Sequence, residues 1–120
     1  MLNLDTHVLI YLLAGELNKT ELSWIEKEEL AISDIVLWEV TKLIQLKRLD
    51  LDVDSKPFRS LLMNLTVIPI SLEIARVSTR LDFRGDPVDE IIAATSLVES
   101  IPLLTRDRTI RKSRIVPLAK

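Results

Sequence analysis

The stretch from Gly85 to Asp107 constrains the fold most, because it predicts one helix followed by one buried strand, with a carboxylate near each end. Asp86 has the chemistry of a helix N-cap, Pro87 suits the first helical position, and Asp89 lies in the first turn near the positive end of the helix dipole. Apolar residues then recur at the 3.6-residue period of a helix, at Val88, Ile91, Ile92 and Val98.

The apolar run from Ile101 to Thr105 is too short for a second helix, so it predicts a buried strand that ends just before Arg106 and Asp107. In open parallel sheets, ligands bind outside the carboxyl ends of the strands. Asp107 is therefore placed where a functional site would be expected.

The remainder of the chain repeats this order of strand and helix. Met1 to Leu4 predicts a short strand, Asp5 follows it, and the apolar stretch from Val8 to Leu13 predicts a helix that Gly15 closes. The other expected elements are a helix over 20–29 capped by Thr20, a strand over 30–32, a helix over 35–48 capped by Ser33 or Asp34, a helix over 56–64, a strand over 66–70 that Pro69 makes an edge strand or a strand end, a helix over 71–81, and a last strand over 115–118. This alternation predicts an α/β fold in which helices cover both faces of a central parallel sheet.

The composition limits both the class of protein and the kind of site. A chain of 120 residues with 48% hydrophobic residues and two glycines is expected to form one globular domain over residues 1–120. The absence of cysteine and the single histidine exclude a disulfide framework, an iron–sulfur cluster and a thiolate or histidine-rich zinc site, so any metal ion would be bound mainly by oxygen. The apolar runs are shorter than the roughly 20 residues that span a bilayer, and no signal peptide is recognisable, so a soluble cytoplasmic protein is expected.

The net charge of −2 is distributed unevenly along the chain. From Arg106 to the C-terminus, six basic residues accompany a single acid, Asp107, which leaves a net charge of −7 for the rest. Arg106 and Arg108 open this basic segment beside the expected site. They are either solvated surface cations or contacts to the phosphates of a nucleic acid.

Glu39 is unusual in the helix over 35–48, because it flanks the apolar stripe of that helix on the helical wheel. A carboxylate in such a place needs a partner. Right-handed crossovers place the carboxyl ends of all strands at one edge of the sheet. Four acids that are distant in the sequence are then expected to converge there: Asp5, Glu39, Asp89 and Asp107.

Converging carboxylates repel one another. Two like charges about 4 Å apart repel by roughly 4 kcal/mol at an effective dielectric constant near 20, so such a cluster takes up protons or binds a cation. Oxygen ligands of this kind suit Mg²⁺ or Mn²⁺. An ion of this type polarises a phosphoryl oxygen and lowers the pKa of a bound water molecule, so hydrolysis of a nucleic-acid backbone is the leading hypothesis.

Each acid also has a purely structural interpretation. Asp89 can interact favourably with the helix dipole, and Asp107 can stabilise a turn. For Asp5 and Glu39 the apolar surroundings favour a functional role, since buried acids are rare without a partner. Asp86 is interpreted mainly as a helix cap.

Several neighbours of these acids have supporting roles in this hypothesis. Three hydroxyl residues, Thr6, Ser33 and Thr105, are caps or strand-end groups that can also hold a carboxylate or a metal-bound water. His7 is more typical of a packed or surface histidine than of a ligand, and it is left out of the site. Trp38 projects away from the apolar stripe of its helix, which is typical of a surface that contacts a partner.

Three segments resemble the sequence motifs of PIN-domain proteins, and most closely those of VapC-type toxins from prokaryotic toxin–antitoxin pairs. The segments are LDTHVLIYLL at residues 4–13, SDIVLWEVTKL at 33–43 and DPVDEIIAATSLVESIPLLTRD at 86–107. The four acids of the family fall on Asp5, Glu39, Asp89 and Asp107. Glu90 departs from the pattern, since many relatives have an arginine there.

The resemblance implies a three-layer α/β/α PIN-like fold and endoribonuclease activity on structured RNA with Mg²⁺ or Mn²⁺ as cofactor. It also implies a homodimer and inhibition by a cognate VapB-like antitoxin that covers the active-site groove. Two other function classes stay open on the residues alone. One is a non-catalytic RNA-binding or protein-interaction domain with the same fold. The other is a phosphatase or receiver-like domain. The sequence argues against this class, because no second Asp stands two residues after Asp5.

Overall fold

The structure, a computed structural model that describes all 120 residues, contains a parallel sheet of four strands in the order β3-β2-β1-β4. The strands are β1 (Leu2–Leu4), β2 (Leu30–Ser33), β3 (Leu65–Ile68) and β4 (Leu103–Leu104). The helices are α1 (Thr6–Ala14), α2 (Lys19–Lys27), α3 (Ile35–Gln45), α4 (Lys56–Met63), α5 (Leu72–Ser78), α6 (Pro87–Glu99) and α7 (Arg108–Arg111). None of these helices is long and apolar enough to cross a membrane.

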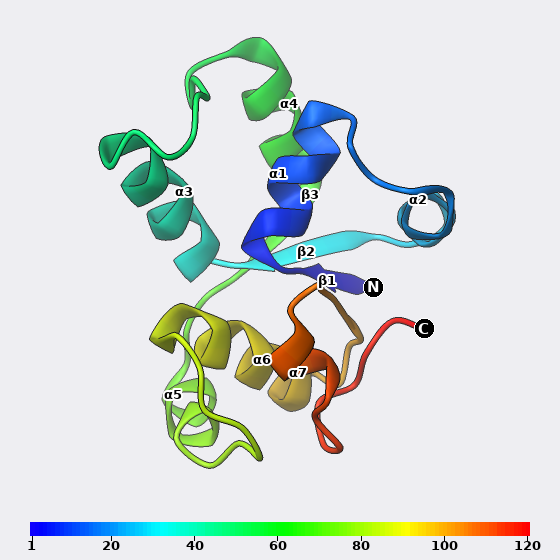
Figure 1. The fold of residues 1–120 in the computed structure, drawn as a ribbon, viewed down its shortest axis with the longest axis vertical. Coiled ribbons are helices and arrows are strands. Elements are labelled where there is room, and N and C mark those ends of the chain that lie inside the picture. Colours follow the sequence, from blue (N-terminus) through cyan, green and yellow to red (C-terminus); the bar gives the residue numbers. More distant parts are fainter.

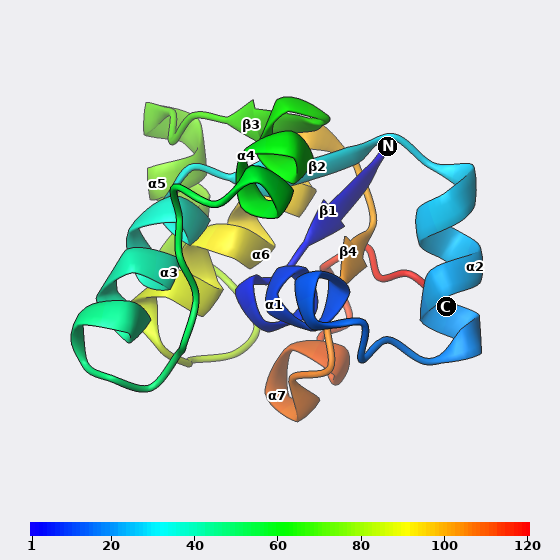
Figure 2. The same ribbon diagram turned by 90° about the horizontal axis from the view of Figure 1, so that it is seen from above.

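The helices form layers on both faces of the sheet, as predicted. In Figure 1, α1, α3 and α4 lie above the strands, and α5 and α6 lie below them. The view from above in Figure 2 shows the strands running side by side beneath α1 and α4, with α2 beyond one end of the sheet. Small residues of α6, Ala93 and Ala94, are fully buried and let this helix pack closely on the sheet. The three-layer α/β/α architecture is therefore confirmed.

The register of the sheet determines which side chains meet at its carboxyl edge. Leu4 of β1 pairs with Leu104 of β4, so the residues that follow, Asp5 and Thr105, emerge side by side. The same parallel arrangement places the ends of β2 and β3 at this edge. The strand that precedes Pro69 lies at the border of the sheet, as the proline predicts.

The helix ends follow the expected capping chemistry in most cases. Asp86 accepts a hydrogen bond from the Val88 amide at 3.0 Å and is followed by Pro87, so α6 begins as predicted. Gly15 closes α1 in the left-handed conformation, with φ 71°. The cap of α2 is Asn18 rather than the predicted Thr20, because Asn18 and Glu21 form a reciprocal capping box.

Other boundaries differ from the sequence prediction, each for a local reason. The helix predicted over 35–48 ends at Gln45, because Lys47 adopts a left-handed conformation with φ 58° and the chain turns there. The predicted last strand contributes only an isolated bridge between Leu103 and Leu118. The turn expected at Asp107 is instead the start of the short helix α7.

Candidate active site

Asp5 is the most buried of the predicted site acids, with 4% of its surface exposed. Its Oδ1 accepts a hydrogen bond from the Thr6 amide at 2.8 Å, and its Oδ2 accepts one from the Thr105 hydroxyl at 2.6 Å. Burial raises the pKa of Asp5, and these two hydrogen bonds oppose that effect. Both carboxylate oxygens are thus held in one orientation at the end of β1.

Thr105 connects two of the predicted acids through its hydroxyl group. The hydroxyl donates to Asp5 and accepts a hydrogen bond from the Asp107 amide at 3.0 Å. The Oδ1 of Asp107 in turn accepts from the Ile110 amide at 2.9 Å and caps α7. The predicted supporting role of Thr105 therefore has a geometric basis, since one side chain fixes the spacing between β1 and the start of α7.

We expect Thr105→Val to lower the free energy of unfolding by roughly 1–2 kcal/mol, because it leaves one oxygen of the buried Asp5 without a donor. Urea unfolding measures this loss. Thr105→Ser retains the hydroxyl and is the matched control; equal losses in both variants would contradict this role.

Asp89 is half-buried in the first turn of α6 and accepts no hydrogen bond from the protein. The pKa of this carboxyl is raised from 3.8 to about 7, first by burial and then by repulsion from Asp5, Asp107, Glu39 and Asp86, in that order. Asp89 is therefore the member of the group whose charge is most strongly opposed by its surroundings.

Three of the four predicted acids line one cleft of about 180 Å³ at the carboxyl edge of the sheet. Its walls are formed by Asp5, His7, Tyr11, Asp89, Arg106 and Asp107. Glu39 does not line this cleft. It lies in a neighbouring groove with Trp38, although its charge still acts on Asp89. His7, which sequence reasoning left out, is part of the wall.

The donors in this cleft fit a hard divalent cation in kind, because the three Asp side chains offer only carboxylate oxygen. The pKa of Asp89 is raised first by burial and then by repulsion from neighbouring carboxylates, and a cation in the cleft would relieve that repulsion. No three acidic or histidine side chains in the structure are close enough together to form a complete metal site. Since Asp89 and Glu39 make no hydrogen bonds, these two side chains are free to turn toward an ion.

The other predicted residues occupy varied positions. Thr6 is fully buried, and its hydroxyl has no hydrogen-bond partner. The hydroxyl of Ser33 accepts a hydrogen bond from the Ile35 amide at 3.3 Å at the start of α3. Arg108 is exposed and forms no ion pair, and Trp38 has 53% of its surface exposed.

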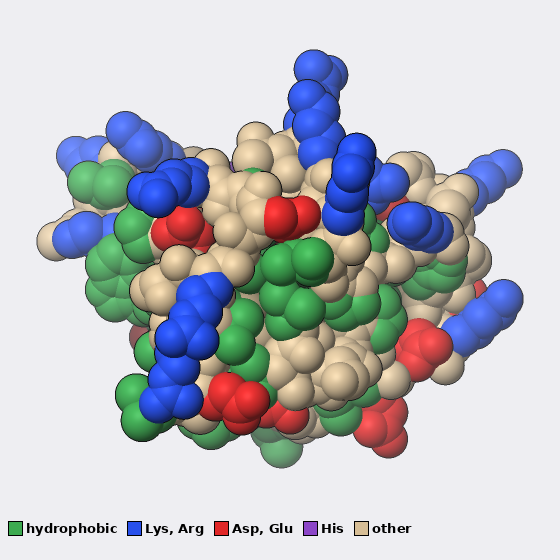
Figure 3. All heavy atoms as spheres, turned by 90° about the horizontal axis from the view of Figure 1, so that it is seen from below, with side chains coloured by type: hydrophobic (Ala, Val, Ile, Leu, Met, Phe, Trp, Pro, Cys, Tyr) green, Lys and Arg blue, Asp and Glu red, His purple; other side chains and the backbone are tan.

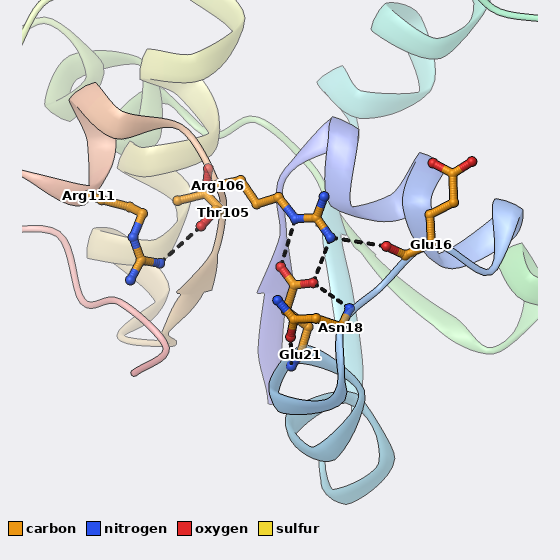
Figure 4. A network of polar contacts seen from close by, with 6 residues as sticks. All are labelled: Glu16, Asn18, Glu21, Thr105, Arg106 and Arg111. Atoms are coloured by element: carbon orange, nitrogen blue, oxygen red, sulfur yellow. Dashed lines mark hydrogen bonds and ion pairs between the residues drawn. The ribbon is translucent and has the colours of Figure 1, made fainter.

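Arg106 forms a bidentate ion pair that sequence reasoning missed. Its Nε donates to Oε2 of Glu21 at 2.9 Å and its Nη2 to Oε1 at 2.7 Å, while Nη2 also reaches the Glu16 carbonyl oxygen at 3.1 Å (Figure 4). The guanidinium lies 4.2 Å from the ring centre of Tyr11. Hydrogen bonding to Arg106 lowers the pKa of Glu21. Arg106 therefore joins α2 to the end of β4, beside the acidic cleft.

Without divalent cations, we expect the protein to lose stability as the pH rises from about 4 to about 7. Because the pKa of Asp89 is raised in the folded state, this state binds more protons than the unfolded chain within that window, so the free energy of unfolding falls with rising pH. Asp89→Asn should remove this pH dependence and raise the free energy of unfolding at pH 8 by roughly 1–3 kcal/mol. Thermal unfolding in a chelating buffer at several pH values measures it.

Asp86→Asn is the control for that experiment, because asparagine also caps helices and Asp86 is exposed. A pH dependence that is the same in Asp89→Asn as in the wild type would contradict the prediction.

Comparison with known proteins identifies the fold independently. A family model described as the PIN domain matches residues 3–115. A toxin–antitoxin complex from Klebsiella pneumoniae is similar in structure, with a TM-score of 0.75, 24% identity and coverage of 99% of this chain and 97% of that chain. FitAcB from Neisseria gonorrhoeae gives a TM-score of 0.72 at 19% identity, covering 100% and 97% of the two chains.

A third structure, VapBC2 from Rickettsia felis bound to a DNA fragment from the promoter, gives a TM-score of 0.77 at 19% identity, with 99% and 98% of the chains covered. No curated protein sequence shows a significant match. The matched family model spans nearly the whole chain, and the solved structures above share its fold. The chain belongs to the PIN-domain family.

Proposed function

We propose that this chain is a metal-dependent endoribonuclease that hydrolyses RNA phosphodiester bonds and acts in the cytoplasm as the toxin of a toxin–antitoxin pair. The observation that carries the proposal is the cleft at the sheet edge, which is lined by Asp5, Asp89 and Asp107. The pKa of Asp89, raised to about 7 by burial and by repulsion from neighbouring carboxylates, supports a functional site there.

In this proposal Asp5, Asp89 and Asp107 hold a Mg²⁺ or Mn²⁺ ion, and Glu39 contributes from α3. A divalent ion supplies charge neutralisation for a phosphodiester and activation of water. Asp5 is held in place by Thr105 and the Thr6 amide, so it acts as the fixed ligand. Asp89 and Glu39 adjust around it because neither is held by a hydrogen bond.

Basic residues close to the cleft support an RNA substrate. Arg106 lines the cleft itself, and Arg108 follows it on α7 without a carboxylate partner. Figure 3 shows Lys and Arg side chains spread over the lower face of the molecule, with single acidic groups between them. Arg106 and Arg108 are therefore proposed as phosphate contacts.

The proposal is tested by cleavage of structured RNA with Mg²⁺, with Mn²⁺ and with a chelator, in the wild type and in Asp5→Asn. Metal-dependent cleavage that disappears in the variant supports it. RNA binding without cleavage under any of these conditions would instead support a non-catalytic RNA-binding domain. Cleavage that is equal with and without the chelator would overturn the metal-dependent mechanism.

Trp38 is proposed to contribute to an interface, either between two copies of the chain or with a VapB-like antitoxin. It lies in a groove of about 530 Å³ between α3 and the start of α6, with Leu43 and Leu46 beside it. The solved structures with this fold include toxin–antitoxin complexes, some of them bound to DNA. An exposed tryptophan in such a groove is typical of an interface residue.

We expect Trp38→Ala to weaken that contact by roughly 2 kcal/mol, or about thirtyfold in dissociation constant, because truncation removes a large apolar anchor. Sedimentation at several concentrations measures the homodimer, and titration with the antitoxin measures the complex. Met63→Ala removes another strongly exposed apolar side chain outside this groove and is the control. Unchanged oligomer size and antitoxin affinity in Trp38→Ala would show that Trp38 has no such role.

A further inference from the structure

A second cavity lies next to the acidic cleft. It has a volume of about 520 Å³ and is enclosed by α2, the end of β4 and α7. Its polar and aromatic walls include Asn18, Thr20, Trp24, Arg106, Arg108 and Arg111, and we call it the arginine pocket. Arg106 lines both this pocket and the acidic cleft, so the two spaces adjoin.

The arginine pocket has an excess of positive charge. Its only acid, Glu21, is buried and already paired with Arg106. The chain forms just one other ion pair, between the N-terminus and Glu28, so Arg108 and Arg111 have no carboxylate partner. Arg111 is oriented by a hydrogen bond from its Nη1 to the Thr105 carbonyl oxygen at 3.1 Å (Figure 4). Two guanidinium groups are thus available to an anion.

Trp24 adds an aromatic surface to the same pocket. It is half-buried and packs against the hydrophobic core, so its ring is supported from behind while part of it lines the pocket. Aromatic rings next to cations are the usual combination that binds single-stranded nucleic acid, because bases stack on the ring while phosphates contact the cations.

We propose that the arginine pocket binds the nucleotide that adjoins the scissile phosphate in a single-stranded segment of RNA, with its phosphate on Arg108 and Arg111 and its base against Trp24. This inference rests on the proposed ribonuclease function. An RNA strand with one phosphate in the acidic cleft would pass Arg106 and enter the pocket directly. The pocket is basic, so the arginines there can hold the next phosphate without a metal ion.

Binding of single-stranded RNA tests the proposal without requiring cleavage. The protein carries Asp5→Asn, which prevents hydrolysis, and Trp38→Phe, which leaves Trp24 as the only tryptophan. An oligonucleotide of about eight nucleotides is titrated in a chelating buffer. We expect quenching of Trp24 fluorescence, and dissociation constants that rise roughly tenfold in Arg108→Ala and in Arg111→Gln. The slope of log affinity against log salt should become shallower by about 0.7 for each phosphate that the variant no longer binds.

Lys112→Ala is the matched control, because Lys112 adjoins Arg111 and is exposed but does not line the pocket. Its dissociation constant should change less than about twofold. Equal losses in Lys112→Ala and Arg108→Ala, or RNA binding that leaves Trp24 emission unchanged, would overturn the proposal. A stronger response to an acidic peptide than to RNA would also overturn it, in favour of a protein partner.

The cleavage assay separates this proposal from the ribonuclease function. With Asp5 restored, a substrate that extends into the pocket should be cut roughly tenfold more slowly by Arg108→Ala and by Arg111→Gln than by the wild type. If the chain cleaves RNA but Arg108→Ala and Arg111→Gln bind and cut like the wild type, the pocket assignment fails and the function stands. If no variant cleaves RNA, the binding experiment still decides the role of the pocket.

Discussion

Asp5→Asn is expected to reduce RNA cleavage roughly a thousandfold and to abolish Mn²⁺ binding in calorimetry. The substitution preserves the size of the side chain and removes its negative charge. Among the four predicted acids, Asp5 is the one whose two carboxylate oxygens are both held by hydrogen bonds, so it is the ligand with the most fixed position. Intact cleavage by this variant would rule out the proposed mechanism.

The loss of activity should not result from unfolding. Burial raises the pKa of Asp5, which means that the charged form is disfavoured in the folded protein. A neutral asparagine in its place should therefore leave the melting temperature at pH 8 unchanged or higher. Asp86→Asn is again the control, because it removes one negative charge at the start of α6 and Asp86 does not line the cleft.

Arg106→Leu is expected to have the largest effect on stability, a loss of roughly 2–4 kcal/mol in the free energy of unfolding at pH 7. The guanidinium is the only cation paired with Glu21, whose side chain is 7% exposed, so the substitution leaves a buried carboxylate without its partner. Urea unfolding measures the loss. Arg108→Leu, which removes an arginine with no ion pair two residues later, should change stability by less than about 0.5 kcal/mol.

The pH dependence of this loss follows from Glu21. Arg106 lowers the pKa of Glu21 in the folded state. The contribution of this ion pair to the free energy of unfolding is therefore present above the ordinary pKa of 4.5, and it disappears as the pH falls through the lowered value. The difference between wild type and Arg106→Leu should therefore shrink below about pH 4. Pairing Arg106→Leu with Glu21→Leu should recover much of the stability, whereas no recovery would show that the ion pair is not the cause.

The sequence was sufficient to predict the fold class and, of the four acids expected to converge, the three that line the cleft. Asp86, Pro87 and the apolar spacing of α6 identify a helix start, and Asp5 and Asp107 follow short apolar runs that have room only for strands. Parallel strands end at one edge, so their acids meet there irrespective of distance along the chain. The local chemistry of each element and the topology of the sheet lead to the same site.

The remaining features depend on tertiary contacts that periodicity does not encode. Glu39 flanks the apolar stripe of α3 as predicted, but the turn of that helix places it in the groove beside Trp38. The pair of Arg106 and Glu21 joins residues 85 positions apart. The Glu21 side of this pair has a local signal in the sequence. Asn18 and Glu21 have the spacing of a capping box, which marks Glu21 as an ordered acid.

The strand that leads to Thr105 and Asp107 is only two residues long, and the C-terminal segment completes its hydrogen bonding. The Leu103 amide donates to the Pro117 carbonyl at 2.9 Å, and the Leu103 carbonyl accepts from the Ala119 amide at 3.0 Å. Val116 and Ala119 are buried against the core. Removal of these last residues would therefore leave the Leu103 amide and carbonyl without partners and weaken the strand that positions Thr105 and Asp107.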